Sequence, residues 1–297
     1  MKRILAATDG SEHGACAVVT GADLARRAGA SLHVVSVVET VLPTLYGAGV
    51  FESEVGDALL LRARRAAEVQ ARQAKAADPH FHVVAGLPAP FITRLASETA
   101  ADVVVVGAHP RPEVKRLLVG STAESVIRLA HCPVLAATAR RRAPFRRVLA
   151  AVDLSPHARS VMHLAGVIVK VDGADLRILH VNEPFPPMLI EAAQFGADDL
   201  LKVGHEAFER LIEETRGLPE SEHCERNGYA GHEILVEARE WEADLLIVGS
   251  QGLGFFNRTI LGSTSMYLLR HGRVATIVVP DKHGHSQTVH REVQDAA

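Results

Sequence analysis

The stretch LLIVGSQGLGFFNRTILGS, residues 245–263, decides the fold because it joins three kinds of segment in one run. An uninterrupted apolar segment comes first, then a loop rich in glycine, and then a Gly-Ser-Thr sequence before a segment with helical pattern. An unbroken Leu/Ile/Val run is typical of a parallel strand that is buried on both faces. A strand, a loop and a helix start in this order predict one unit of a layered α/β fold.

A second copy of this stretch lies 142 positions earlier, as VVVVGAHPRPEVKRLLVGS in residues 103–121. A further pair, RILAATDGSEH in residues 3–13 and RVLAAVDLSPH in residues 147–157, is identical at seven of eleven positions. Because the order of the pieces is kept, the chain reads as a duplicated domain. We assign residues 1–139 and 146–280 to the two domains and residues 281–297 to a flexible tail.

Each half alternates apolar strand segments with helical segments. In the first half the expected strands lie at residues 4–8, 31–38, 81–85, 102–107 and 132–137, and a long loop follows the fourth. The second half repeats the order, with SEHCERN, residues 221–227, as its least strand-like segment. The pattern predicts two tandem doubly wound domains, each a five-stranded parallel sheet flanked by helices.

The composition of the chain argues against several classes of function. Asp plus Glu number 35 against 32 for Lys plus Arg, so the near balance gives no general attraction to nucleic acid or to an anionic membrane. Three widely separated cysteines predict neither a zinc site nor a disulfide framework. The opening residues do not resemble a signal peptide and no apolar run has the length of a bilayer span, so we expect a cytoplasmic protein.

The glycine loop of the second half predicts a phosphate site. Ligands of doubly wound sheets bind beyond the carboxyl ends of the strands, where Asp153 follows the first strand and Gly249 follows the fourth. Glycine permits a positive φ and a close backbone approach, and a helix start offers unpaired N–H groups. Arg258 lies inside the loop and adds a cationic donor. The chain contains no GxxxxGK[ST] motif, and the glycines follow the fourth strand rather than the first, which disfavours NAD and FAD.

These features together resemble the universal stress protein family in its tandem two-domain form. The family pattern is Gly, two residues, Gly, nine residues, Gly and a Ser or Thr, and it is matched at every spacing by Gly249, Gly252, Gly262 and Ser263. The resemblance implies ATP as the ligand, with Asp153 at the adenosine end and the backbone of Val181 reading adenine. It also implies that ribose and phosphates are held by Gly249, Gly252, Gly262, Ser263 and Thr264.

The first half departs from this pattern. It keeps Asp9, Gly107, Gly120 and Ser121, but Pro110 replaces the second glycine and Pro112 follows. Proline fixes φ and has no N–H to donate. We therefore expect weak or no ATP binding in this half, and the alternative is that it has taken up a different ligand.

The leading hypothesis is an ATP-binding regulatory protein of stress response, without catalytic residues or a metal site. Two alternatives stay open: an adenylating enzyme of related architecture, and an interaction module without nucleotide. Family members pair through the fifth strand, so residues 134–136 are expected beside residues 276–278 in an internal pseudo-dimer. A protein partner and a homodimer are also expected, whereas nucleic acid and membranes are not.

Overall fold

The computed structural model describes residues 1–39, 54–111, 116–138, 144–184, 197–215, 217–251 and 261–281. The predicted tail beyond residue 281 lies outside this part of the chain. In the first half the elements are β1 (Arg3–Ala7), α1 (Glu12–Ala28), β2 (Ser31–Glu39), α2 (Glu54–Gln73), β3 (His80–Gly86), α3 (Pro88–Glu98), β4 (Val103–Arg111), β5 (Arg116–Val119), α4 (Ser121–Leu129) and β6 (Val134–Thr138). In the second half they are β7 (Arg147–Val152), α5 (Ala158–Asp172), β8 (Asp175–Asn182), α7 (Ala197–Glu214), β9 (Ser221–Asn227), α8 (Ala230–Glu240), β10 (Leu245–Gly249), α9 (Ser263–His271) and β11 (Ala275–Val279).

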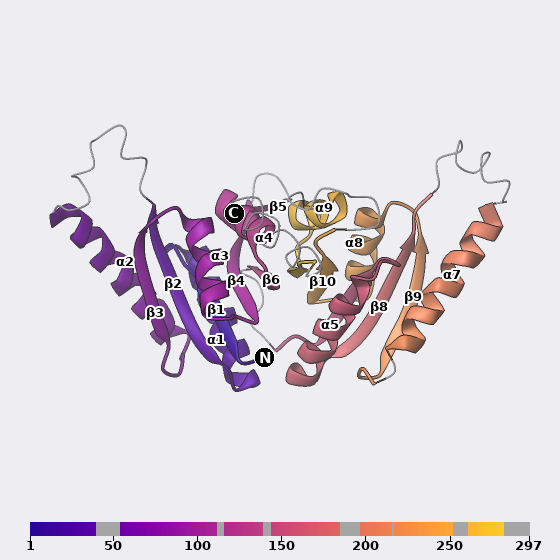
Figure 1. Ribbon diagram of the computed structural model, residues 1–297, viewed down its shortest axis with the longest axis horizontal. Coiled ribbons are helices and arrows are strands. Elements are labelled where there is room, and N and C mark those ends of the chain that lie inside the picture. Colours follow the sequence, from indigo (N-terminus) through magenta and orange to yellow (C-terminus); the bar gives the residue numbers. More distant parts are fainter. Residues whose placement is uncertain are drawn as a thin grey trace, which may run out of the picture.

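The strands form one continuous sheet of 11 strands in the order β3-β2-β1-β4-β6-β11-β10-β7-β8-β9, with β5 paired to β4. Figure 1 shows the two halves side by side, with α2 and α7 at the outer ends. Within each half the five main strands are parallel, which confirms the predicted fold class. The segment predicted to be least strand-like, residues 221–227, is strand β9 and forms one edge of the sheet.

The halves join through the antiparallel pair β6 and β11. Val134 pairs with Val278, Leu135 with Ile277 and Ala136 with Thr276. The expected pairing of residues 134–136 with residues 276–278 is therefore confirmed. The seam is reinforced by Asp172, a buried carboxylate that lies 2.6 Å from Nε of Arg27 and accepts the backbone N–H of Phe145 at 2.8 Å.

Helices cover both faces of the sheet. One apolar cluster lies under α1, α2, α5 and α7, and a second lies under α3, α4, α8 and α9. Both clusters run across the seam and contain residues of both halves. Because continuous apolar strands leave no polar face, this two-sided cover is what the strand sequences require.

The start of α1 shows how the sequence sets one local boundary. Ser11 is the N-cap, with extended backbone angles, and its hydroxyl accepts the N–H of Gly14 at 3.2 Å. Gly29 ends the helix in the left-handed region at φ 61°. The helix expected over residues 11–28 is observed as α1 because both signals are present.

The first half differs from expectation after its fourth strand. Residues 108–120 were expected to form a long loop, but β4 continues to Arg111 and turns back through β5 as an antiparallel hairpin. Ala108 pairs with Val119 and His109 with Leu118. Pro110 and Pro112 gave no indication of a strand pair in the sequence. A strand at the margin of a sheet nevertheless tolerates a residue that lacks an N–H.

Candidate nucleotide site

A cavity in the second half lies beyond the carboxyl ends of β7, β8 and β10. Its volume is about 510 Å³, and helices α5, α8 and α9 begin at its walls. Its lining includes Asp153, Val181, Gly249, Gly262, Ser263 and Thr264. Six of the eight residues singled out from the sequence therefore surround one cavity. The other two, Gly252 and Arg258, lie outside the described residues.

Asp153 presents one satisfied and one unsatisfied carboxylate oxygen. Its Oδ1 accepts the N–H of Ser155 at 3.2 Å and the hydroxyl of Ser155 at 2.6 Å. Its Oδ2 is buried and has no hydrogen-bond partner among the described residues. A buried acceptor without a donor is costly, so this oxygen is suited to a hydroxyl or amino group brought by a ligand.

The start of α9 forms the opposite wall. Gly262 is the N-cap and contributes no side-chain hydrogen bond, and the first turn contains no acidic residue. The N–H groups of the first helical residues have no intrahelical acceptor, so those of Ser263 and Thr264 are available at the cavity. The dipole of the helix adds positive potential at the same place. This wall favours an anionic group such as a phosphate.

The glycines of the site act through close approach and not through unusual backbone angles. Gly262 has φ −58°, and Gly249 is also outside the positive-φ region. The expectation of positive φ is therefore wrong at these two positions. A Cβ on Gly249 would lie 2.8 Å from the His157 ring, and one on Gly262 would lie 3.2 Å from the carbonyl oxygen of Ser250.

His157 packs against Gly249 at the start of the loop. It is buried at 8% exposure, and its Nε2–H donates to the carbonyl oxygen of Val279 at 2.9 Å. The same carbonyl accepts the N–H of Ser250 at 2.8 Å, and Gly262 in turn donates its N–H to Ser250 at 2.8 Å. The hydroxyl of Ser265 donates to the carbonyl of Gly249 at 2.6 Å. The described residues at the two ends of the loop are thus connected by hydrogen bonds to β10 and β11.

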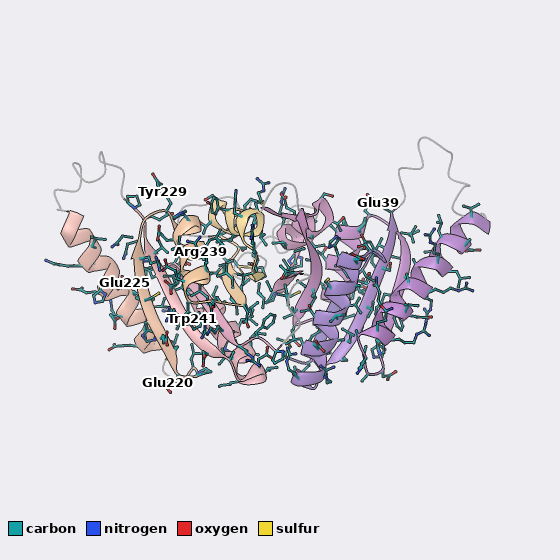
Figure 2. The ribbon with its side chains drawn as sticks, turned by 180° about the vertical axis from the view of Figure 1, so that it is seen from behind. Glu39, Glu220, Glu225, Tyr229, Arg239 and Trp241 are labelled. Atoms are coloured by element: carbon teal, nitrogen blue, oxygen red, sulfur yellow. The ribbon has the colours of Figure 1, made fainter. Side chains whose placement is uncertain are left out.

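The wall formed by β8 is held by polar contacts behind it. Asn182 donates its amide to Glu225 Oε2 at 3.1 Å, and His205 Nδ1–H donates to Glu225 Oε1 at 2.5 Å. Burial raises the pKa of Glu225, but hydrogen bonds from His205 and Asn182 outweigh it and lower the pKa overall. The hydrogen bond to Glu225 raises the pKa of His205. Glu225 lies on the edge strand β9 in Figure 2.

A hydrogen bond between a carboxylate and a backbone N–H joins the end of β8 to the start of α8. Glu183 accepts the N–H of Ala230, the first residue of α8, at 2.9 Å, and both line the cavity. His180 donates its Nδ1–H to the carbonyl of Val152 at 3.0 Å and is buried. These contacts fix the end of β8, so Val181, which lines the cavity, lies on a rigid strand.

Sequence reasoning did not identify the supporting residues His157, Asn182, Glu183 and Ser265. His157 was visible only as a repeat of His13, which duplication alone explains. The others bond to partners distant in sequence, so no local spacing marks them. Their roles depend on which strand ends become neighbours in the folded sheet.

The corresponding place in the first half is built differently. Asp9 repeats the local turn, because its Oδ1 accepts the N–H of Ser11 at 2.9 Å and also the hydroxyl of Ser11. Gly107 lies so close to α1 that an added Cβ would be 2.4 Å from the carbonyl oxygen of His13. In this half the residues that correspond in sequence to the glycine-rich stretch include the hairpin of β4 and β5.

The comparisons with known proteins agree with this architecture. The model described as the Universal stress protein family matches residues 1–137 and again residues 144–280. A universal stress protein of Thermus aquaticus is 36% identical over 138 residues, which is 46% of this chain and 98% of that protein. One of Mycobacterium tuberculosis is 27% identical over 246 residues, covering 77% of this chain and 78% of the relative.

A solved structure extends the likeness across both halves. The crystal structure of a universal stress protein from Archaeoglobus fulgidus aligns with a TM-score of 0.68 at 23% identity, covering 94% of this chain and 98% of that one. None of the helices in the described ranges is both long and apolar enough to cross a membrane. With two matches to the family model on one continuous sheet, this chain belongs to the universal stress protein family as a tandem two-domain member.

Proposed function

We propose that this protein is an ATP-binding regulatory protein of stress response, with one nucleotide site in the second half. The observation that carries the proposal is the meeting of Asp153, Val181 and the start of α9 around a single cavity of about 510 Å³. That volume lies within the usual range for small-molecule sites. The two ends of the cavity differ in character, as the two ends of a nucleotide do.

The nucleotide is expected to lie with its base against β8 and its phosphates at α9. The apolar residues Leu179, Leu201 and Ile234 line the cavity together with Val181 and suit a purine ring, and the backbone of Val181 is expected to read adenine. Asp153 Oδ2 is an acceptor for a donor group of the adenosine. The N–H groups at the start of α9, with the hydroxyls of Ser263 and Thr264, suit the phosphates.

The proposal is for binding without steady turnover. The two histidines that line the cavity, His157 and His180, each use a ring nitrogen on a backbone carbonyl. Such fixed histidines support the wall of a site and are poor candidates for moving protons during a reaction. Adenylation of a substrate remains the alternative, and it predicts continuous release of pyrophosphate from ATP.

The chain offers a matched pair of variants. Asp153→Asn keeps the oxygen that Ser155 bonds and turns the unsatisfied Oδ2 into a donor. Asp9→Asn makes the same change in the equivalent turn of the first half. Native mass spectrometry of the purified chain should show one adenine nucleotide per chain, and calorimetric titration with ATP should show about a tenfold or larger loss of affinity in Asp153→Asn alone.

Each other outcome has a clear meaning. Equal loss in both variants, or loss only in Asp9→Asn, would place the site elsewhere and contradict the proposal. Release of pyrophosphate at a steady rate would favour the adenylating enzyme. Purified protein that neither carries nor takes up any adenine nucleotide would favour an interaction module.

A further inference from the structure

The hairpin of the first half extends to the phosphate end of the second half. Ala108 is the last residue of β4 that pairs with β6, opposite Thr138, and it also pairs with Val119 of β5. From there β5 runs beside α9, the helix whose start lines the candidate nucleotide cavity. Figure 1 shows β5 and α9 next to each other at the centre of the molecule. A strand of the first half thus lies against the helix whose start lines the candidate cavity of the second half.

Helix α9 is held on three sides. Leu268 and Leu269 are buried against the sheet in a cluster that also contains Val126 and Ile127 of α4. On a second side α8 comes so close that a Cβ on Gly231 would be 2.7 Å from the ring of Tyr267. The third side faces the first half.

On that third side β5 lies alongside the helix and one ion pair crosses between the halves. Arg270 of α9 lies 3.8 Å from the carboxylate of Glu124 of α4. Glu124 also pairs with Arg128 at 2.9 Å. The first half therefore contributes β5 and Glu124 of α4 to one flank of α9.

We propose that β5 is a positioning element for the nucleotide site, so that ATP binding in the second half and formation of the β4–β5 hairpin stabilise each other. The proposal rests on the proposed function, because it takes α9 as the phosphate wall. A wall that must present N–H groups to a ligand loses affinity when it moves by a fraction of an ångström.

The coupling is reciprocal for thermodynamic reasons. If the hairpin holds α9 in the orientation that binds phosphate, then bound nucleotide must favour the hairpin by the same factor. The hairpin includes residues that correspond in sequence to the glycine-rich stretch of the second half. According to this proposal, the segment that corresponds to the binding loop does not bind nucleotide in the first half but positions the site of the second half.

Hydrogen exchange on the intact wild-type chain tests one direction. With saturating ATP, backbone amides of residues 116–119 should exchange about five- to tenfold more slowly than in the nucleotide-free protein. Amides of β3, residues 80–86, lie at the far edge of the sheet and should not change. Slower exchange at the start of α9 reports the binding itself.

A variant tests the other direction. Replacing residues 116–119 with glycine (Arg116→Gly, Leu117→Gly, Leu118→Gly, Val119→Gly) removes the strand propensity of β5 and should weaken ATP binding about five- to tenfold. Val84→Gly weakens strand β3 of the same half and serves as the control, with lower thermal stability but unchanged ATP affinity. Affinities are measured well below the unfolding temperature, so a general loss of stability does not alter them.

The outcomes separate the two proposals. Wild-type affinity in the four-glycine variant, or hairpin amides that ignore ATP while the start of α9 is protected, would overturn the coupling and leave the nucleotide site intact. If the variant does not fold, hydrogen exchange on the wild-type chain still decides. A wild-type chain that binds no adenine nucleotide would remove both proposals.

Discussion

Replacing Gly249 with alanine should destabilise the protein through one identifiable contact. The new Cβ would lie 2.8 Å from Cδ2 of His157, whereas ordinary contact begins near 3.4 Å, so the ring would have to retreat by about 0.6 Å. The ring is buried and its Nε2–H donates to Val279 at 2.9 Å. A retreat of that size along the bond would take the hydrogen bond to the limit of its range.

The expected cost follows from these two terms. Overpacking a well-filled site costs about 1–3 kcal/mol, and loss of the hydrogen bond adds about 1 kcal/mol. Partial relaxation of the ring should leave about 2–3 kcal/mol, which corresponds to a fall in melting temperature of roughly 3–5 °C for a chain of this size. Differential scanning calorimetry of the purified variant measures this fall.

Other glycines of the two loops supply graded controls. At Gly107 the added Cβ would be 2.4 Å from a backbone oxygen, so the destabilisation should be larger than at Gly249. At Gly120 no atom lies within 4 Å of the added Cβ, so Gly120→Ala should be close to neutral. A Gly249→Ala protein as stable as wild type, or an order of effects that places Gly120 above Gly249, would refute the packing argument.

Two further predictions concern ionisable groups away from the cavity. Burial first, and then neighbouring histidines, lower the pKa of His33 and His82, which lie 3.0 Å apart through Nδ1 and Nε2. Below pH 6.5 the unfolded chain then binds more protons than the folded chain, so the free energy of unfolding should fall as the pH drops through this region. The fall should be less steep in a His33→Gln, His82→Gln variant. Urea midpoints that do not change with pH in either protein would contradict this. Glu237 is 5% exposed and pairs with Arg177 at 2.5 Å and with Arg226 at 2.6 Å, so Glu237→Gln should cost about 2–3 kcal/mol in urea unfolding, and a change below about 0.5 kcal/mol would show that the pairs contribute little.

Much of the fold could be predicted because its signals are local or repeated. The apolar strands, the capping serine of α1 and the offset between the halves all lie in short stretches of sequence. The pairing of residues 134–136 with residues 276–278 also followed, since it was implied by the family resemblance. These features depend on few choices of geometry.

The candidate site was only partly readable. The motif and the family resemblance together located six residues that do surround one cavity, but the positive φ that glycine permits is not used at Gly249 or Gly262. Their need for a missing side chain comes from His157 and Ser250, which are set by the tertiary arrangement. Local sequence could not reveal it.

The hairpin was missed for a related reason. Residues 108–119 contain two prolines, and the sequence gives no pattern that separates a long loop from a strand pair there. Strand β5 lies beside α9, which is about 150 positions further along the chain. That neighbour is present only when both halves are folded.

The antiparallel seam has an evolutionary consequence. When two identical subunits associate, every amino-acid change occurs twice, and a gain on one side is imposed on the other. Joining the two halves in one chain removes that constraint, since they stay paired through β6 and β11 while the residues of each half change independently. A change such as Pro110 in place of the second glycine can then be confined to one half.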